Sequence, residues 1–168
     1  MMKHSAGLLL YRRDKTGRHG AGIEVLLVHP GGPFWAGKDA HAWSMPKGEI
    51  DPDEDALAAA QREFAEETGF APAEVAASGA AIALGRYKHG QKIIQAWAIE
   101  GDCDPARLRS NSFSMEWPPR SGQMRDFPEA DRAAWFDLAT ARRRIHKNQL
   151  PFLDALEACL ARGAGAPD

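Results

Sequence analysis

Three glutamates near the middle of the chain have the residue type and spacing that point most directly to chemistry: Glu63, Glu66 and Glu67. On a helix, positions i, i+3 and i+4 share one arc of the surface. The three carboxylates repel one another there, and the negative end of the helix dipole adds to the cost. A divalent cation would offset this repulsion, and oxygen ligands suit Mg²⁺, with Mn²⁺ as a second candidate. The alternative is a solvated acidic face on a surface helix.

A short helix that ends at a glycine must position these side chains. Asp51 suits the N-cap, Pro52 the first helical position and Glu54 the N3 position. Gly69 supplies the left-handed residue that ends a helix. The sequence therefore predicts a helix over residues 52–68. An apolar stripe that would pack this helix on a core consists of Leu57, Ala60 and Phe64.

The whole stretch resembles the signature of the Nudix hydrolases. That signature is a glycine, five residues, a glutamate, seven residues and then Arg-Glu-U-x-Glu-Glu-x-Gly-U, with U a bulky apolar residue. Its fixed positions are all present, as Gly48, Glu54, Arg62, Glu63, Phe64, Glu66, Glu67, Gly69 and Phe70. The resemblance implies an α/β fold, an α/β/α sandwich with a mixed β-sheet. It also implies that the Gly48 carbonyl joins Glu63, Glu66 and Glu67 as a metal ligand.

Two charged residues of the signature, Glu54 and Arg62, are interpreted as structural. Arg62 lies at i, i+4 to Glu66, at the edge of the metal arc, where it can orient a ligand carboxylate or tie the loop to the helix. The general base stays open between one of the signature glutamates and a carboxylate from elsewhere in the chain.

Nudix enzymes often recruit a further glutamate from a later loop, and three residues are candidates here: Glu100, Glu116 and Glu129. We favour Glu129 as a catalytic residue. Pro128-Glu129, followed six residues later by Trp135-Phe136, resembles the loop that carries this glutamate in several members of the family. A solvated loop acid is the alternative.

Three side chains outside the glutamate cluster are candidates for substrate binding, each with a structural alternative. Lys47 can contact phosphate or be an ordinary surface lysine. Trp43, like Phe34 and Trp35 in the same loop, can stack on a nucleobase or pack over the sheet edge. Tyr87 lies seventeen residues after the signature, a placement that resembles the diadenosine polyphosphate hydrolases. A lone tyrosine in a strand is otherwise ordinary sheet packing.

The charge pattern favours a small anionic substrate over a nucleic acid. The formal net charge is −2, and the short basic run from Arg142 to Lys147 is interpreted as a solvated helix face. Nucleic acid is therefore not expected as a partner. Lys88, His89 and Lys92, in a turn beside Tyr87, would add positive charge near a polyphosphate, or form a solvated turn.

The length and the cysteines favour one cytoplasmic domain. A chain of 168 residues is long enough for one well-buried core, so we predict a single domain over 1–168. Cys103 and Cys159 are far apart and lack metal-ligand spacing, as expected of a reduced protein. The apolar run Ala6–Tyr11 is too short for a membrane span, so no membrane partner is expected. The protein is expected to be a monomer or a homodimer.

Alternation and turn residues predict the remaining elements. Strands are expected at 5–12, 23–29, 80–88, 92–100 and 133–136, a helical turn at Pro72, and helices at 138–145 and 151–162. Residues 14–22 are expected to form a turn. The segment 102–126, rich in proline, is expected to be an insertion that lines or covers the cleft. The tail 163–168 is expected to fray.

These observations lead to one main function and two alternatives. The main hypothesis is a Mg²⁺-dependent pyrophosphohydrolase that cleaves a nucleoside diphosphate linked to another moiety, with dinucleoside polyphosphates favoured. The first alternative is a nucleoside triphosphate or nucleotide-sugar pyrophosphatase. The second is a Nudix module that binds a nucleotide without cleaving it.

Overall fold

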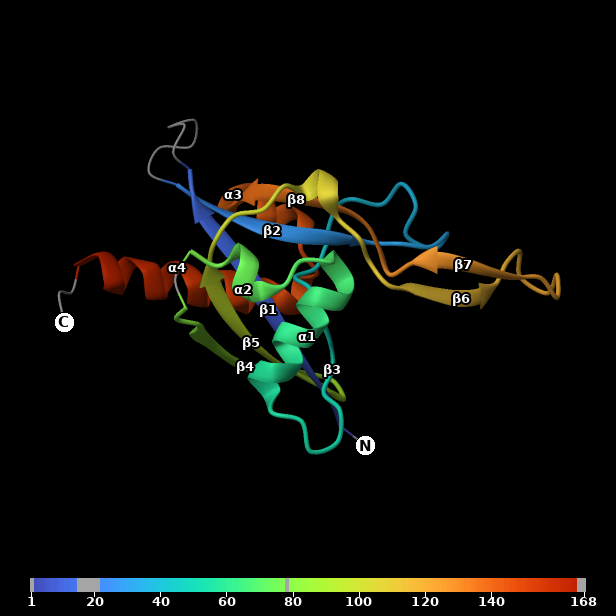
Figure 1. Cartoon of the computed structure of the whole chain (residues 1–168), viewed down its shortest axis with the longest axis horizontal. Helices are drawn as coiled ribbons and strands as arrows, with labels where there is room; N and C mark the ends of the chain where they lie inside the picture. The colour runs from blue at the N-terminus through green and yellow to red at the C-terminus, as the bar shows by residue number, and fades with distance from the viewer. Residues whose placement is uncertain (1, 15–21, 78, 166–168) are drawn as a thin grey trace.

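The computed structural model describes residues 2–14, 22–77 and 79–165, and a six-stranded sheet runs through it (Figure 1). The strands are β1 (Lys3–Arg13), β2 (Ile23–Pro30), β3 (Lys47–Glu49), β4 (Ile82–His89), β5 (Lys92–Glu100) and β8 (Ala130–Asp137). Their order is β4-β5-β1-β2-β8, with β3 paired to β1. β1 and β5 are parallel and the other pairs are antiparallel, so the sheet is mixed, as the sequence predicted.

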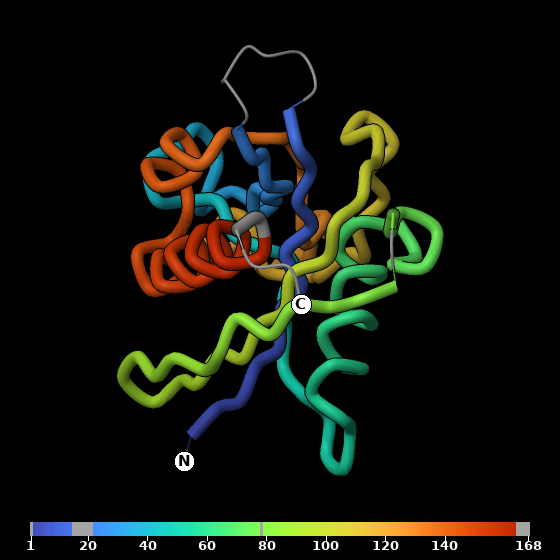
Figure 2. The backbone as a smooth tube through the Cα atoms, turned by 90° about the vertical axis from the view of Figure 1, so that its left-hand side faces the viewer, coloured from blue at the N-terminus to red at the C-terminus, as the bar shows by residue number. Residues whose placement is uncertain are grey.

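Helices cover both faces of the sheet and give three layers (Figures 1 and 2). On one face lie α1 (Ala56–Thr68) and α2 (Pro72–Val75), and on the other α3 (Leu138–Arg144) and α4 (Leu150–Gly165). Leu8 of β1 is buried in the same cluster as Phe64 of α1, whereas Leu9 is buried with Phe152 of α4. A strand buried on both faces is uniformly apolar, as the middle of β1 from Ala6 to Tyr11 is. The predicted α/β/α sandwich is confirmed.

Two strands, β2 and β3, pair with different parts of β1. Tyr11 to Arg13 of β1 pair with β2, and Ser5 to Gly7 pair with β3. The loop between β2 and β3 returns along β2, where Ser44 and Val28 exchange backbone hydrogen bonds of 2.8 and 2.9 Å. This arrangement brings Lys47 and Gly48 against α1.

Most predicted elements are confirmed, and their boundaries differ at the ends. The strand predicted at 133–136 is part of the longer β8, and the helical turn at Pro72 is α2. The predicted turn at 14–22 lies mostly outside the described residues. Part of the tail that is expected to fray, residues 163–165, is the last turn of α4, and residues 166–168 lie outside the described residues.

The start of α1 differs from the prediction, and a backbone conformation explains why. The helix begins at Ala56, and its N-cap is Asp55, whose side chain accepts the N–H of Ala58. Asp53 has φ +65°, which a helix cannot contain. Asp51 and Glu54 instead close a separate turn, in which the Asp51 N–H donates to Glu54 Oε1 at 3.0 Å. The predicted end is confirmed: Gly69 has φ +79° and donates its N–H to the Ala65 carbonyl.

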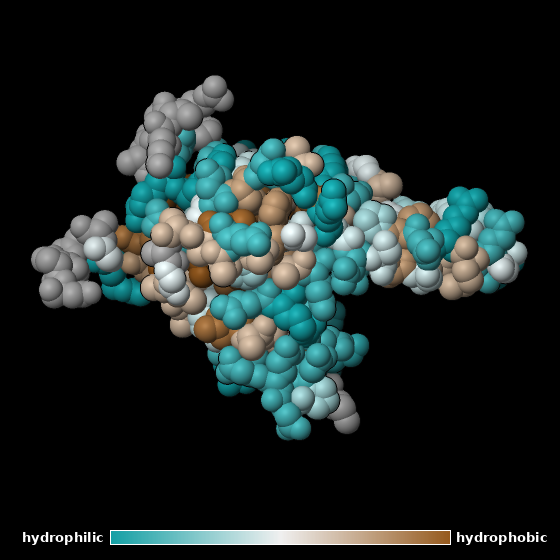
Figure 3. Space-filling model, in the orientation of Figure 1, coloured by the Kyte–Doolittle hydropathy of each residue, from teal (hydrophilic) through white to brown (hydrophobic). Residues whose placement is uncertain are grey.

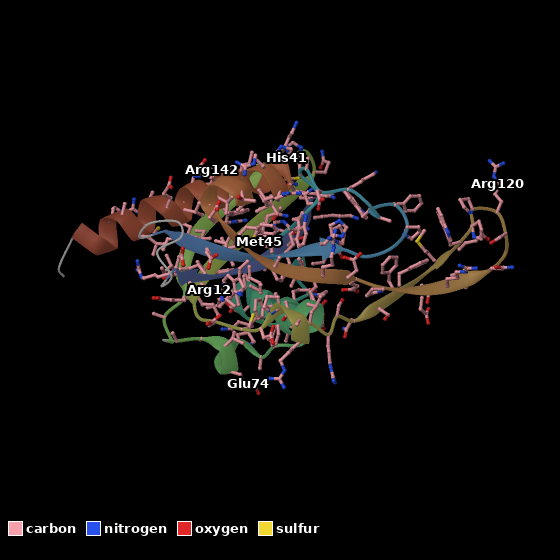
Figure 4. The ribbon with its side chains drawn as sticks, turned by 90° about the horizontal axis from the view of Figure 1, so that it is seen from above. Arg12, His41, Met45, Glu74, Arg120 and Arg142 are labelled. Atoms are coloured by element: carbon pink, nitrogen blue, oxygen red, sulfur yellow. The ribbon has the colours of Figure 1, made fainter. Side chains whose placement is uncertain are left out.

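The segment predicted as an insertion is a β-hairpin that projects from the body (Figure 1). The strands β6 (Ser112–Glu116) and β7 (Met124–Pro128) form the hairpin, and the short helix η1 (Pro105–Arg107) precedes it. At its base, the Arg109 N–H donates to the Thr68 carbonyl and the Asn111 N–H to the Glu66 carbonyl, so the hairpin is fixed to the end of α1. Arg120 marks its tip, far from the three layers (Figure 4).

Candidate functional site

Arg62 is the centre of the charged cluster that α1 presents. Its Nη1 donates to Glu63 at 2.9 Å and to Glu66 at 3.1 Å. Its Nε and Nη2 donate to Glu54 at 2.9 and 3.0 Å, and Nη2 also donates to the Glu49 carbonyl. The guanidinium thus ties the loop before the helix to two signature carboxylates and offsets their repulsion. This geometry agrees with the structural roles expected for Glu54 and Arg62.

The loop backbone approaches the helix most closely at Gly48. A Cβ built on Gly48 would lie 2.1 Å from the Glu63 carboxyl carbon, so a side chain there would displace the Glu63 carboxylate. Glycine at this position therefore leaves room for the Glu63 carboxylate against the backbone of β3. This packing explains the signature glycine, because the Glu63 carboxylate occupies the space that its side chain would fill.

Glu67 faces away from Arg62, towards β3. The Lys47 N–H donates to Glu67 Oε2 at 3.3 Å. Burial raises the pKa of Glu67 to about 8, with Glu63 and Glu129 adding to the rise and Lys47 opposing it. Burial also lowers the pKa of Lys47, and Glu67 opposes that shift. The environment thus disfavours the charged forms of both the carboxyl and the amine. Such perturbed pKa values are typical of sites that bind a charged ligand.

A cavity of about 170 Å³ connects these residues to groups from distant parts of the chain. Its lining consists of Val28, Pro30, Ser44, Lys47, Glu67, Glu129 and His146. Glu129 is therefore the candidate that the fold brings to the signature glutamates. Glu100 instead pairs with Arg13 at 3.6 Å, and Glu116 accepts the Arg120 N–H on the hairpin. The face of the molecule over α1 and its preceding loop is hydrophilic (Figure 3).

The lining of this cavity differs from the sequence-based expectations in two respects. Residues 102–126 were expected to line or cover the cleft, but none of them lines this cavity; the hairpin positions Glu129, which follows it. The second difference is His146, which lines the cavity although the basic run from Arg142 to Lys147 is interpreted from the sequence as a solvated helix face. The only signal for His146 in the sequence is that it lies between two predicted helices, because its neighbours in the cavity are remote in sequence.

Trp43 does not have the free ring face that stacking on a nucleobase needs. Its side chain is 4% exposed, packs edge-on to Phe136 at 4.9 Å, and lies beneath the Arg132 guanidinium at 5.1 Å. The interpretation of Trp43 as a substrate-binding residue is therefore wrong, and its alternative, packing, holds. The ring is held in the core because the loop carrying it returns over β2 and β8.

Tyr87 lies on the face of the sheet that α4 covers. Its ring packs edge-on to Phe152 at 5.0 Å, and the side chain is 39% exposed. It is not among the residues that line the cavity with Glu67 and Glu129. The geometry favours sheet packing over direct contact with the reacting phosphate.

The oxygen donors at the end of α1 suit a hard divalent cation. Glu63 and Glu67 are partly buried, and burial raises the pKa of both. Within the described residues, no three His, Cys, Asp or Glu side chains are gathered closely enough to hold a metal ion as they stand. Arg62 explains this spacing, because it holds Glu63 and Glu66 by hydrogen bonds while Glu67 turns to Lys47. Carboxylate and carbonyl oxygens are the ligands that Mg²⁺ and Mn²⁺ prefer, so the donor set fits such an ion.

The pKa of Glu67 makes the stability of the metal-free protein depend on pH. The folded state keeps a proton that the unfolded chain releases above about pH 4.5, so the free energy of unfolding falls as pH rises from about 5 to about 8. At about 1.4 kcal/mol per pKa unit the whole effect is roughly 5 kcal/mol, and contact with water reduces it to about 2–4 kcal/mol. Urea unfolding in chelator at pH 5, 6.5 and 8 measures it.

Glu67→Gln is the matched variant for this measurement, because glutamine mimics the protonated carboxyl. We expect its free energy of unfolding to fall less between pH 5 and 8 than that of the wild type. Glu74→Gln, an exposed acid on α2, should keep the full fall. Equal pH dependence in the wild type and Glu67→Gln would show that Glu67 ionises at its ordinary pKa.

A backbone clamp fixes the position of Glu129. Its N–H donates to the Asn111 carbonyl at 2.7 Å, and its carbonyl accepts the Gly31 N–H at 3.0 Å. A Cβ on Gly31 would lie 1.9 Å from the Pro128 carbonyl oxygen, so any side chain there must displace this loop.

We therefore expect Gly31→Ala to lower kcat by about tenfold, through misplacement of Glu129, with a smaller change in KM. Steady-state kinetics on whichever nucleotide is turned over measures this. Gly79→Ala is the matched control, because its Cβ would meet nothing within 4 Å. An unchanged kcat in Gly31→Ala would mean that the position of Glu129 does not limit the reaction.

Within the described parts of the chain, no helix is long and apolar enough to cross a membrane. Comparison with solved structures finds the same fold. A C. elegans Ap4A hydrolase in a binary complex aligns with a TM-score of 0.60 at 22% identity, covering 95% of this chain and 98% of the other. The NUDIX domain of Shewanella oneidensis NrtR, complexed with ADP ribose, aligns with a TM-score of 0.61 at 15% identity, covering 95% and 89%.

Sequence comparison adds curated relatives over a shorter span. An RNA pyrophosphohydrolase of Caulobacter vibrioides is 38% identical over 63 residues, which is 34% of this chain and 37% of that protein. One of Rhodopseudomonas palustris is 41% identical over 74 residues, or 44% and 33%. The chain thus matches about a third of the length of these relatives. The NUDIX domain family matches residues 2–156, nearly the whole sequence, and the protein belongs to this family.

Proposed function

We propose that the protein is a Mg²⁺-dependent hydrolase of phosphoric anhydride bonds, acting on a nucleoside diphosphate linked to another moiety, with dinucleoside polyphosphates as the favoured class. One observation carries the proposal. Lys47, Glu67 and Glu129, brought from three separate segments, line one cavity at the end of the signature helix. A cation and two carboxylates suit phosphate oxygens and an attacking water in the same small space.

The proposed roles follow from these positions. Gly48, Glu63, Glu66 and Glu67 would hold the divalent cation, which when bound neutralises phosphate charge and acidifies a water. Lys47 would bind a phosphate oxygen through its ammonium. Glu129 would accept a proton from the attacking water. Burial and the charge of Glu66 raise the pKa of Glu129 towards the working pH of a general base.

The favoured substrate class rests on the fold shared with an Ap4A hydrolase, together with the position of Lys47. A second candidate is the 5′ end of a triphosphorylated RNA, because the curated relatives are RNA pyrophosphohydrolases. A cytoplasmic location is proposed from the two free cysteines, Cys103 and Cys159. The small-molecule substrate is the partner proposed.

A substrate panel tests the proposal. It contains dinucleoside polyphosphates, nucleoside triphosphates, ADP-ribose, nucleotide sugars and a 5′-triphosphorylated oligoribonucleotide, each assayed with Mg²⁺, with Mn²⁺ and with chelator. We expect dinucleoside polyphosphates to be cleaved fastest, and cleavage to stop in chelator. Faster cleavage of the oligoribonucleotide would overturn the favoured class. Nucleotide binding without turnover of any member would favour the non-catalytic module.

A further inference from the structure

A second depression lies directly beside the cavity that holds Glu67 and Glu129. Its lining consists of His41, His89, His146, Lys147 and Asn148, and we call it the His–Lys depression. His146 lines both hollows, so they adjoin. Asn148 also lines a third hollow that contains Lys47, Gly48 and Lys92. The surface therefore continues from the carboxylates into a region of opposite charge character.

The side chains of the His–Lys depression suit an anion. None of the five lining residues is acidic, and all five carry N–H groups that can donate hydrogen bonds. Lys147 has no acidic side chain within 4 Å among the described residues, so its charge is available to a ligand. Burial lowers the pKa of His146, and the charges of Lys47, His41 and Lys92 add to the effect. A bound anion would offset the positive charges of these neighbours.

The fold holds this depression in a fixed position relative to the cavity. The loop before β3 contributes His41, whose Nδ1 lies 2.8 Å from the Ile145 carbonyl. The segment between α3 and α4 contributes His146, whose N–H donates to the Trp43 carbonyl at 2.8 Å. The His146 ring also packs edge-on to Trp35 at 5.4 Å. These contacts fix the positions of His41 and His146 relative to the cavity, while His89 and Lys147 are exposed at the rim of the depression.

Strand alternation separates two neighbouring residues of β4. His89 pairs with Lys92, and it shares its face with Tyr87, which packs on α4. Lys88 lies between them and points to the opposite face of the sheet. Of the basic residues that the sequence grouped in this turn, His89 thus lines the depression and Lys88 does not. Lys88 is therefore a suitable control, because it carries a positive charge in the same hairpin but does not line the depression.

We propose that the His–Lys depression binds the phosphate groups of the substrate that lie farthest from the cleaved bond, so that the enzyme selects substrates with long phosphate chains. The proposal rests on the proposed function, because it assigns a subsite to the same substrate. A chain of two phosphates would be held at the cavity alone. Each further phosphate would extend towards His146 and Lys147 and gain charge-assisted hydrogen bonds there.

The test is kcat/KM for dinucleoside polyphosphates with two to five phosphates. Wild type, His89→Ala/Lys147→Ala and Lys88→Ala are compared. We expect the wild-type value to rise with phosphate number. The double variant should lose about tenfold or more on the longest substrates and less than about twofold on the shortest. Lys88→Ala should follow the wild type throughout, although it removes one charge from the same hairpin.

Two results would overturn the proposal: an equal loss at every chain length, or no loss at any length in the double variant. A binding assay separates it from the proposed function. Inorganic tripolyphosphate is titrated by calorimetry into wild type and the double variant, without any turnover. Weaker binding by about tenfold in the double variant supports the subsite even if no nucleotide is cleaved. Equal binding in the two proteins overturns it, even if the enzyme is active.

Discussion

Replacing Glu67 by glutamine should abolish turnover while leaving the fold intact, with kcat/KM in Mg²⁺ lower by about a thousandfold or more. Glu67 is the signature carboxylate that lines the cavity with Lys47 and Glu129. Glutamine is neutral, so it removes one negative ligand and the charge that holds a divalent cation. Its amide oxygen can still accept the Lys47 N–H, so the local hydrogen bond survives.

The measurement is steady-state kinetics on the best substrate of the panel, with thermal unfolding to confirm the fold. Glu74→Gln supplies the control, because it removes one exposed acidic charge from α2. Titration with Mn²⁺, followed by its electron paramagnetic resonance signal, should show weaker metal binding in Glu67→Gln alone. Full activity in Glu67→Gln would remove this residue from the proposed metal ligands.

Replacing Arg62 by alanine should affect both stability and activity. Its guanidinium bridges Glu54, Glu63 and Glu66 and also holds the Glu49 carbonyl. Removal leaves partly buried carboxylates without their counter-charge, so we expect the free energy of unfolding to fall by about 2–4 kcal/mol. Because the same bonds orient two proposed metal ligands, activity should fall by about 10–100-fold.

Lysine should not restore the function of Arg62, because one ammonium cannot reproduce the planar fork that binds Glu54 through two nitrogens. Arg142→Ala is the matched control. Arg142 also bonds two carboxylates, Asp154 and Glu157, but both are largely exposed, so its loss should cost less than about 1 kcal/mol of stability. Urea unfolding in chelator and kinetics in Mg²⁺ measure the two effects. Equal losses in Arg62→Ala and Arg142→Ala would contradict a special role for the cluster.

Local features of the sequence predicted the elements around the site well. The spacing of Glu63, Glu66 and Glu67 predicted a helix, and Gly69 marked its end. Alternation and turn residues predicted the main strands, among them the segments that form β1, β2, β4 and β5. These features are local, because periodicity and backbone conformation act between residues a few positions apart. The start of α1 was predicted at residue 52 but lies at Ala56, because the positive φ of Asp53 is incompatible with a helix.

The sequence by itself thus determined the chemical character of the site: a glutamate helix, a glycine that must lie against it, and an arginine at its edge. Only the tertiary structure decided which distant groups join it. The hairpin base clamps Glu129 beside Glu67, the segment between α3 and α4 delivers His146, and the returning loop buries Trp43. These contacts join residues tens of positions apart. The physical reason is that strand pairing and core packing fix such contacts. The local periodicity of a segment does not specify which distant segment it will meet.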